Sequence, residues 1–267
     1  MRTSCDIDVL VHEEAVDQTA QIIVDKLGYT YEKKQYHDIS LMSDGGVHLE
    51  LHHSIKENKA NIDALLSECW DYVTVLDGYE CEFTNEFFFF HQIAHASYHF
   101  LHGGCGVRPI LDLYLLQRKM PFDSTVLDEM LERSGIKKFF DAAKALSEVW
   151  FGGSEHSDVT RRMEDYLLRG GVYGSTANSM AVGQQKEKGR LGYIINRIWL
   201  PYELLCITYP RLNGRKYLQL FYEIKRWLRI FNPEARKHKK RDLDAIKNLS
   251  AKHKSDVNCM LNELGLM

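Results

Sequence analysis

The sequence contains no apolar run approaching the ~18 residues needed to cross a bilayer, and its first residues lack the apolar core of a signal peptide. Proline is scarce, with five in 267 residues, and glycine numbers 18, so the bias typical of disordered or fibrous chains is missing as well. With 45% apolar and 27% charged residues, the composition is that of an ordinary globular protein. We expect no transmembrane segment.

Zinc-type cysteine spacing is also absent. Six cysteines are scattered along the chain, and no two of them form a CxxC pair, which excludes the common structural zinc motifs. Reduced thiols are typical of proteins in the cytosol, so we expect a cytoplasmic protein.

The net charge of −3 at pH 7 conceals two oppositely charged parts. Residues 1–185 carry 16 basic and 29 acidic side chains, a difference of −13, and residues 186–267 carry 18 and 8, a difference of +10. A basic segment attracts phosphate-bearing partners or docks on an acidic part of its own chain. The basic run 236–241 lacks interleaved aromatic side chains that stack on bases, so nucleic acid is not the favoured partner, although it is not excluded.

Alternation near the N-terminus predicts a strand over residues 5–11. Asp6 and Asp8 share one face of this strand, and Ile7 and Val9 share the other face, which we expect to be buried. A helix with an acidic start follows and ends on Gly28.

Residues 29–55 lose the helical period and carry an Asp-Gly turn between two segments suited to strands, which predicts a hairpin. In its second strand, Glu50 shares one face with His48 and His52, while apolar residues occupy the other face.

Beyond residue 60, three-to-four periodicity predicts helices over residues 62–76, 85–102, 108–118, 124–134, 136–151 and 159–168, with one short strand at 79–83. The Gly-, Ser- and Gln-rich segment near 170–190 predicts a long mobile loop. In the basic segment 216–231, we expect an apolar stripe that includes Tyr217, Phe221 and Leu228 to pack in the core, with a membrane surface or a partner as the alternative.

These elements predict an α+β fold with two parts. Residues 1–82 form a small mixed β-sheet with helices, and residues 83–267 form a larger all-helical part that carries the loop and a basic C-terminal tail.

An Asp-x-Asp pair on one strand, with a third acid on a neighbouring strand, is a donor set suited to two divalent ions. Mg²⁺ takes oxygen ligands in octahedral geometry, and carboxylates two residues apart project in parallel from a strand. Two ions about 3.5–4 Å apart stabilise both the attacking and the leaving oxygen of a phosphoryl or nucleotidyl transfer. For so short a pattern, simple polarity of an exposed strand face remains the alternative.

The segment RTSCDIDVLV, followed by the strand HLELHH, resembles the nucleotidyltransferase superfamily that includes DNA polymerase beta. In that superfamily, an h-Asp-h-Asp-h strand and a later h-[Asp/Glu]-h strand bind the metals. Further segments, namely LGY, HD, LELH, HASYHFLHGGCGVRPILDLYLL and LPYELLCITYP, resemble the largely uncharacterised bacterial nucleotidyltransferase family within it, over nearly the whole chain.

The resemblance implies a nucleotidyltransferase-like core in which Asp6, Asp8 and Glu50 are both the catalytic residues and the metal ligands. It implies Mg²⁺ or Mn²⁺ as cofactor and a role for Glu50 in activating an acceptor hydroxyl. The side chains expected to contact the nucleoside triphosphate are Arg2, Ser4, His52, His99 and Arg108.

One departure from the superfamily concerns the Gly-Ser element that grips the triphosphate from a preceding strand and helix. No residue ahead of Met1 supplies it. Three alternatives follow: the start is truncated, a different element contacts the phosphates, or catalysis has been lost.

His91, His95, His99 and His102 fall on one face of a predicted helix, but no carboxylate stands at His-Glu-x-x-His spacing. One hypothesis is a hydrolase with a transition metal on this stripe. A second is that His99, or Arg108 after a flexible GGCG segment, reaches substrate phosphates, for which a guanidinium is suited. A third is that these polar groups join the helical part to the α/β part.

The sequence thus predicts metal-dependent transfer of a nucleotidyl group from a nucleoside triphosphate to an unknown acceptor hydroxyl. The rival hypothesis is a catalytically impaired protein of the same fold that binds a partner through its basic, aromatic C-terminal third.

Overall fold

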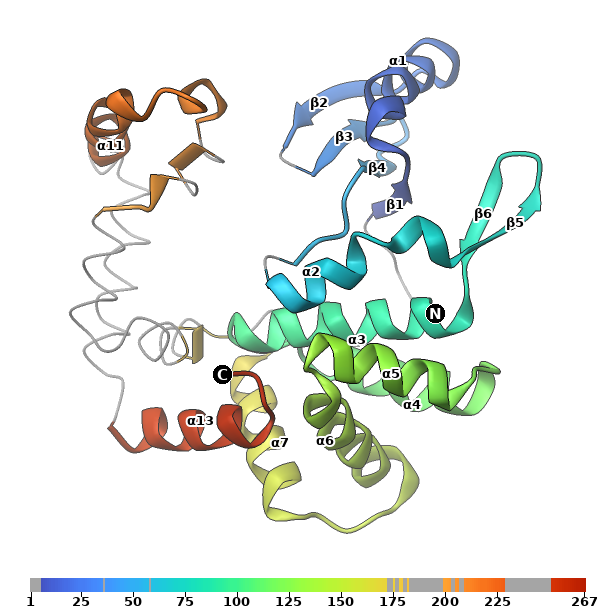
Figure 1. Ribbon diagram of the computed structural model, residues 1–267, viewed down its shortest axis with the longest axis vertical. Helices are drawn as coiled ribbons and strands as arrows, with labels where there is room; N and C mark the ends of the chain where they lie inside the picture. Colours follow the sequence, from blue (N-terminus) through green and yellow to red (C-terminus); the bar gives the residue numbers. More distant parts are fainter. Residues whose placement is uncertain are drawn as a thin grey trace. The chain divides into compact units, whose positions relative to one another are not determined.

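The computed structural model describes residues 6–35, 37–57, 59–171, 175, 178–179, 182, 199–202, 205–206, 209–228 and 251–267. The chain divides into two compact units, residues 1–70 and 71–267, which are described separately (Figure 1). The domain boundary expected after residue 82 stays a prediction. Arg2, Ser4, most of the predicted loop near 170–190 and the basic run 236–241 lie outside the described residues.

The first unit contains a four-stranded mixed sheet with the strand order β1-β4-β3-β2. Strand β1 (Asp6–Leu10) is parallel to β4 (His48–His52), and β4 is antiparallel to β3 (Asp38–Met42). Strand β2 (Thr30–Lys34) completes the sheet beside β3. The hairpin predicted around the Asp-Gly turn is therefore β3–β4, and with the helices that follow, the predicted α+β class is confirmed.

Helix α1 (Val16–Leu27) covers one face of this sheet (Figure 1). Its buried Val16 and Ala20 pack against apolar side chains of β3 and β4, namely Ile39, Leu41 and Leu51. The helix ends at Gly28, whose φ of 71° is readily adopted only without a Cβ, as the sequence predicted. Since side chains alternate along a strand, packing of the apolar set on α1 turns the polar set to the opposite face.

The expectation that Ile7 and Val9 of β1 are buried is wrong. Their exposed fractions are 49% and 38%. The reason is that β1 lies at the edge of the sheet, whereas the core beneath α1 is built from strands β3 and β4. Alternation predicted the strand but not its position in the sheet.

The helix predicted over residues 62–76 is shorter in the structure. Helix α2 (Ala60–Leu66) is followed by a 3₁₀ turn at Cys69–Tyr72, and then by a hairpin of β5 (Val73–Asp77) and β6 (Glu80–Phe83). The β-branched residues of β5 and an Asp-Gly turn with Gly78 at φ 55° favour strands here. The single strand predicted at 79–83 is thus one arm of a hairpin.

The predicted helices from residue 85 to 170 are present with small differences at their ends. They are α3 (Asn85–Leu101), α4 (Arg108–Lys119), α5 (Ser124–Ser134), α6 (Lys137–Ser147, continued by a π-helical turn at Glu148–Gly152) and α7 (Asp158–Gly170). Near the C-terminus, α13 (Ala251–Glu263) packs on α7. None of the helices in the described residues is long and apolar enough to pass through a bilayer.

The stripe on α11 (Gln219–Leu228) does not pack in the core, contrary to the expectation. Tyr217, just before the helix, Phe221 and Leu228 are 80%, 61% and 58% exposed. The side that packs instead carries Glu223, whose carboxylate is buried and accepts hydrogen bonds from the Leu200 amide and the Arg226 guanidinium. This hydrogen bonding fixes the orientation of the helix and leaves the apolar stripe on the surface.

Two glycines with positive φ provide a matched test of packing in the second unit. A Cβ at Gly103 (φ +122°) would lie 2.7 Å from the Ser175 carbonyl oxygen, whereas a Cβ at Gly135 (φ +71°) would have no heavy atom within 4 Å. We expect Gly135→Ala to cost about 1 kcal/mol, the strain of a left-handed residue, and Gly103→Ala to cost at least about twice as much. Thermal unfolding of both variants checks this; equal losses would show that the Ser175 contact does not constrain Gly103.

Candidate metal centre

The register of the sheet brings the acidic residues together. Because β1 and β4 are parallel and in register, Asp6 lies opposite His48 and Asp8 lies opposite Glu50. All four side chains occupy alternate positions, so they project from the face that α1 does not cover. Ser40 of β3 lies opposite Glu50 on its other side, which makes Glu50 the centre of this polar face.

Two triads of potential metal ligands share Glu50. One triad is Asp6, His48 and Glu50, and the other is Asp8, Glu50 and His52, with the donor atoms of each triad within 4.8 Å of one another. Each triad takes one carboxylate from β1 and two side chains from β4. Among the residues that the structure describes, no other group of three such side chains comes as close together.

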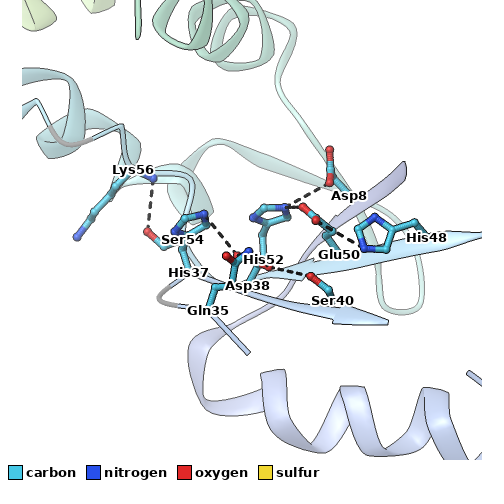
Figure 2. A network of polar contacts seen from close by, with 10 residues as sticks. All are labelled: Asp8, Gln35, His37, Asp38, Ser40, His48, Glu50, His52, Ser54 and Lys56. Carbon is cyan, nitrogen blue, oxygen red and sulfur yellow. Dashed lines mark hydrogen bonds and ion pairs between the residues drawn. The ribbon is translucent and has the colours of Figure 1, made fainter. Parts of the chain in front are cut away.

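His52 contacts both carboxylates of its triad (Figure 2). Its Nε2 atom lies 3.3 Å from Asp8 Oδ1 and 3.4 Å from Glu50 Oε2. The side chains of Glu50 and His52 on the inner strand β4 are both 21% exposed, whereas that of Asp8 on β1 is 63% exposed. The site is therefore open to water on the β1 side. A ligand can therefore approach the carboxylates from solvent.

His48 occupies the corresponding position on the other side of Glu50 (Figure 2). Its Nε2 atom lies 3.8 Å from Glu50 Oε1 and 3.5 Å from Glu32 Oε2. Glu32 arrives from β2, where the pairing with β3 shifts register between Tyr31 and Lys33. No role was predicted for Glu32, because no local pattern in the sequence reveals this register shift.

Asp38, the first residue of β3, is a buried carboxylate for which no role was predicted, although His37–Asp38 is one of the segments that carry the family resemblance. It is 1% exposed and lies opposite His52 in the sheet. Its oxygens accept hydrogen bonds from Gln35 Nε2 and from the Ser40 hydroxyl, and His37 Nε2 is 3.5 Å away (Figure 2). These contacts satisfy the carboxylate, and Asp38 lies on the same polar face as Glu50 and His52, directly beside His52.

The structure does not place all of the residues that were predicted to contact the triphosphate. Arg2 and Ser4 lie outside the described residues. His99, at the end of α3, and Arg108, the first residue of α4, belong to the second unit, and their contacts to a nucleotide stay a prediction.

The histidines of α3 interact with one another along the helix. His95 and His99 are exposed, with their Nε2 atoms 3.0 Å apart, and the His91 ring stacks near that of His95. His102 Nδ1 lies 2.7 Å from the carbonyl oxygen of Tyr98. The predicted common face is therefore present, but in the described part of the chain it forms no three-ligand group.

The GGCG segment between α3 and α4 is packed rather than open. The carbonyl oxygen of Gly103 accepts hydrogen bonds from the Ser175 amide and from Asn178 Nδ2. Burial raises the pKa of the Cys105 thiol to about 12, so this thiol stays protonated near neutral pH. The predicted flexibility of this segment is not what the structure shows.

Comparison with known proteins identifies one match. The model of a family described as "Uncharacterised nucleotidyltransferase" matches residues 1–152, more than half of the chain and the whole of the sheet that carries both triads. No curated protein and no solved structure matches the sequence.

Proposed function

The chain belongs to the uncharacterised nucleotidyltransferase family, and we propose that it transfers a nucleotidyl group from a nucleoside triphosphate to an acceptor hydroxyl, with divalent Mg²⁺ or Mn²⁺ held by Asp6, Asp8 and Glu50. The observation that carries this proposal is the register that sets Glu50 of β4 beside the two aspartates of β1. Carboxylates on adjacent strands form a rigid set of hard oxygen donors, which fits these two ions.

The donor chemistry passes a simple test of fit. Each triad contains two carboxylates with donor atoms within 4.8 Å of one another, which is close enough for one ion to be shared between them. When bound, divalent ions neutralise charge on the phosphates and on the developing oxyanion. Asp6 and Asp8 would then bind and orient the ions, since their regular strand directs both side chains to the same face.

The reaction requires a bond from the acceptor oxygen to the α-phosphorus, and pyrophosphate leaves as the bond to its bridging oxygen breaks. The hydroxyl proton must go to a base. Glu50 is the candidate within the site, because it is only partly exposed and its carboxylate faces both triads. Positioning and charge neutralisation carry most of the catalysis in transfers of this kind, so no covalent intermediate on the protein is needed.

Arg2, Ser4, His52, His99 and Arg108 are proposed to contact the triphosphate. Guanidinium groups suit phosphate oxygens because they donate two parallel hydrogen bonds. The acceptor is left as a hydroxyl compound of unspecified class.

Nucleotide binding tests the proposal without knowledge of the acceptor. We expect calorimetric titration of the full chain with each of the four common ribonucleoside triphosphates to show binding of at least one in Mg²⁺ or Mn²⁺, and its loss in EDTA. Slow release of pyrophosphate, with water as the acceptor, should follow the same metal dependence. Binding of none of the four nucleotides with either metal would contradict the proposal and favour a protein that keeps the fold without the chemistry.

A further inference from the structure

We propose that His48 and His52 are themselves metal ligands, so that the site binds first-row transition ions such as Mn²⁺ in preference to Mg²⁺. This inference rests on the proposed function, specifies its metal, and reassigns His52 from a triphosphate contact to a metal ligand. The evidence for it is the position of the two imidazole Nε2 atoms beside the carboxylates.

The distances at His52 are those expected between neighbouring ligands of one ion. In an octahedral shell with bonds of about 2.1 Å, adjacent donor atoms lie roughly 3 Å apart. His52 Nε2 lies 3.3 Å from Asp8 Oδ1 and 3.4 Å from Glu50 Oε2, so the three donors already surround a common point.

His48 repeats the arrangement on the opposite side of the shared carboxylate. Its Nε2 atom faces Glu50 Oε1, at 3.8 Å, whereas His52 faces Glu50 Oε2. Each oxygen of Glu50 is thus directed at a different imidazole (Figure 2), which is the arrangement of a carboxylate that bridges two ions. Glu32 Oε2 lies 3.5 Å from His48 Nε2 but belongs to neither triad, so it contacts the imidazole and is not counted as a ligand.

The orientation of the His52 ring is set by its neighbours. It stacks on His37, with ring centroids 5.9 Å apart and planes inclined by 15°. His37 Nε2 in turn lies 3.5 Å from the buried carboxylate of Asp38, opposite His52 in the sheet. The contact with His37 therefore restricts the rotation of the His52 ring.

The nitrogen donors decide which ion fits. Mg²⁺ is a hard ion that selects oxygen ligands and sheds its waters reluctantly. Imidazole suits transition ions, and carboxylates suit Mn²⁺ as well as Mg²⁺, so a mixed set of carboxylates and imidazoles favours Mn²⁺ over Mg²⁺. Ion pairing by a protonated imidazole gives the same distances without metal, and the experiment must separate these two cases.

The test is pulsed electron paramagnetic resonance of the full chain loaded with Mn²⁺. We expect electron spin echo modulation from imidazole nitrogen in the wild-type protein, and its loss when His48→Gln and His52→Gln are combined. Calorimetry should show that the double variant loses at least about tenfold in Mn²⁺ affinity while its Mg²⁺ affinity changes little. His53→Gln is the matched control, because His53 directly follows the last residue of β4 and belongs to neither triad.

The outcomes separate the inference from the proposed function. Mn²⁺ bound without nitrogen modulation would overturn the inference and leave a carboxylate-only metal site, which the proposed function tolerates. A protein that binds neither Mn²⁺ nor Mg²⁺ would overturn both. The wild-type spectrum decides the first question even if the double variant does not fold.

Discussion

Replacing Asp8 by Asn lowers the rate of pyrophosphate release by about a hundred- to a thousandfold, the scale of loss when one preorganised charged or polar group is removed from an active site. Asn keeps the shape of Asp8 but removes the charge that holds a cation, and Asp6→Asn should act in the same way. Both side chains are exposed on an edge strand, so neither substitution disturbs the core. Measurement of pyrophosphate release at saturating Mn²⁺ and nucleotide checks the prediction.

Asp25→Asn is the matched control for these variants. Asp25 is also an exposed aspartate of the first unit, where it accepts a hydrogen bond from Gln21 of the same helix, and it belongs to neither triad. We expect its rate to equal that of the wild-type protein. Retained turnover in both Asp6→Asn and Asp8→Asn, with circular dichroism unchanged, would remove these residues from the reaction.

Replacing Phe100 by Ala destabilises the second unit by about 3–5 kcal/mol, the usual cost of truncating a buried aromatic residue. Phe100 has no exposed surface, and its ring packs against Phe139 at 5.3 Å and Tyr166 at 4.6 Å between centroids. The substitution leaves a cavity between α3, α6 and α7, because these helices are fixed by further contacts and cannot close it fully. Chemical denaturation followed by circular dichroism measures the free energy of unfolding.

Phe88→Ala serves as the internal standard for this experiment. Phe88 stands on the same helix but is 38% exposed, so its truncation removes much less buried surface. We expect its cost to be clearly below that of Phe100→Ala. Similar costs for the two substitutions would mean that the aromatic cluster around Phe100 does not determine the stability of this unit.

Local sequence patterns predicted the strand faces and helix positions, which depend on residues close together in the sequence. Alternation placed Asp6 and Asp8 on one face and Glu50 on one face of its own strand, and helical periodicity located α3 to α7. The pairing of β1 with β4 is different, because it joins segments about forty residues apart, and only the resemblance to a known family suggested it. Asp38 and Glu32 reach the neighbourhood of the site through other pairings, those of β3 with β4 and of β2 with β3.

Two errors show where local patterns fail. At residues 73–77 the apolar spacing allowed a helix, but the β-branched side chains and the following turn stabilise a strand. On α11 the periodicity identified an apolar stripe but not the side that packs, since buried hydrogen bonds to Glu223 determine the orientation of the helix. On α11 the deciding interaction joins residues far apart in the sequence, whereas at residues 73–77 the deciding signals were local.

The parallel pairing of β1 and β4 makes the site sensitive to some changes of length and tolerant of others. Asp6 and Asp8, and likewise His48, Glu50 and His52, must stay an even number of residues apart, because an inserted or deleted residue between them would turn one side chain toward α1. The turn at Asp44–Gly45 lies outside both strands, so residues added there lengthen a connection without altering the ladder. Scanning insertions should therefore spare activity in this turn and destroy it inside either strand.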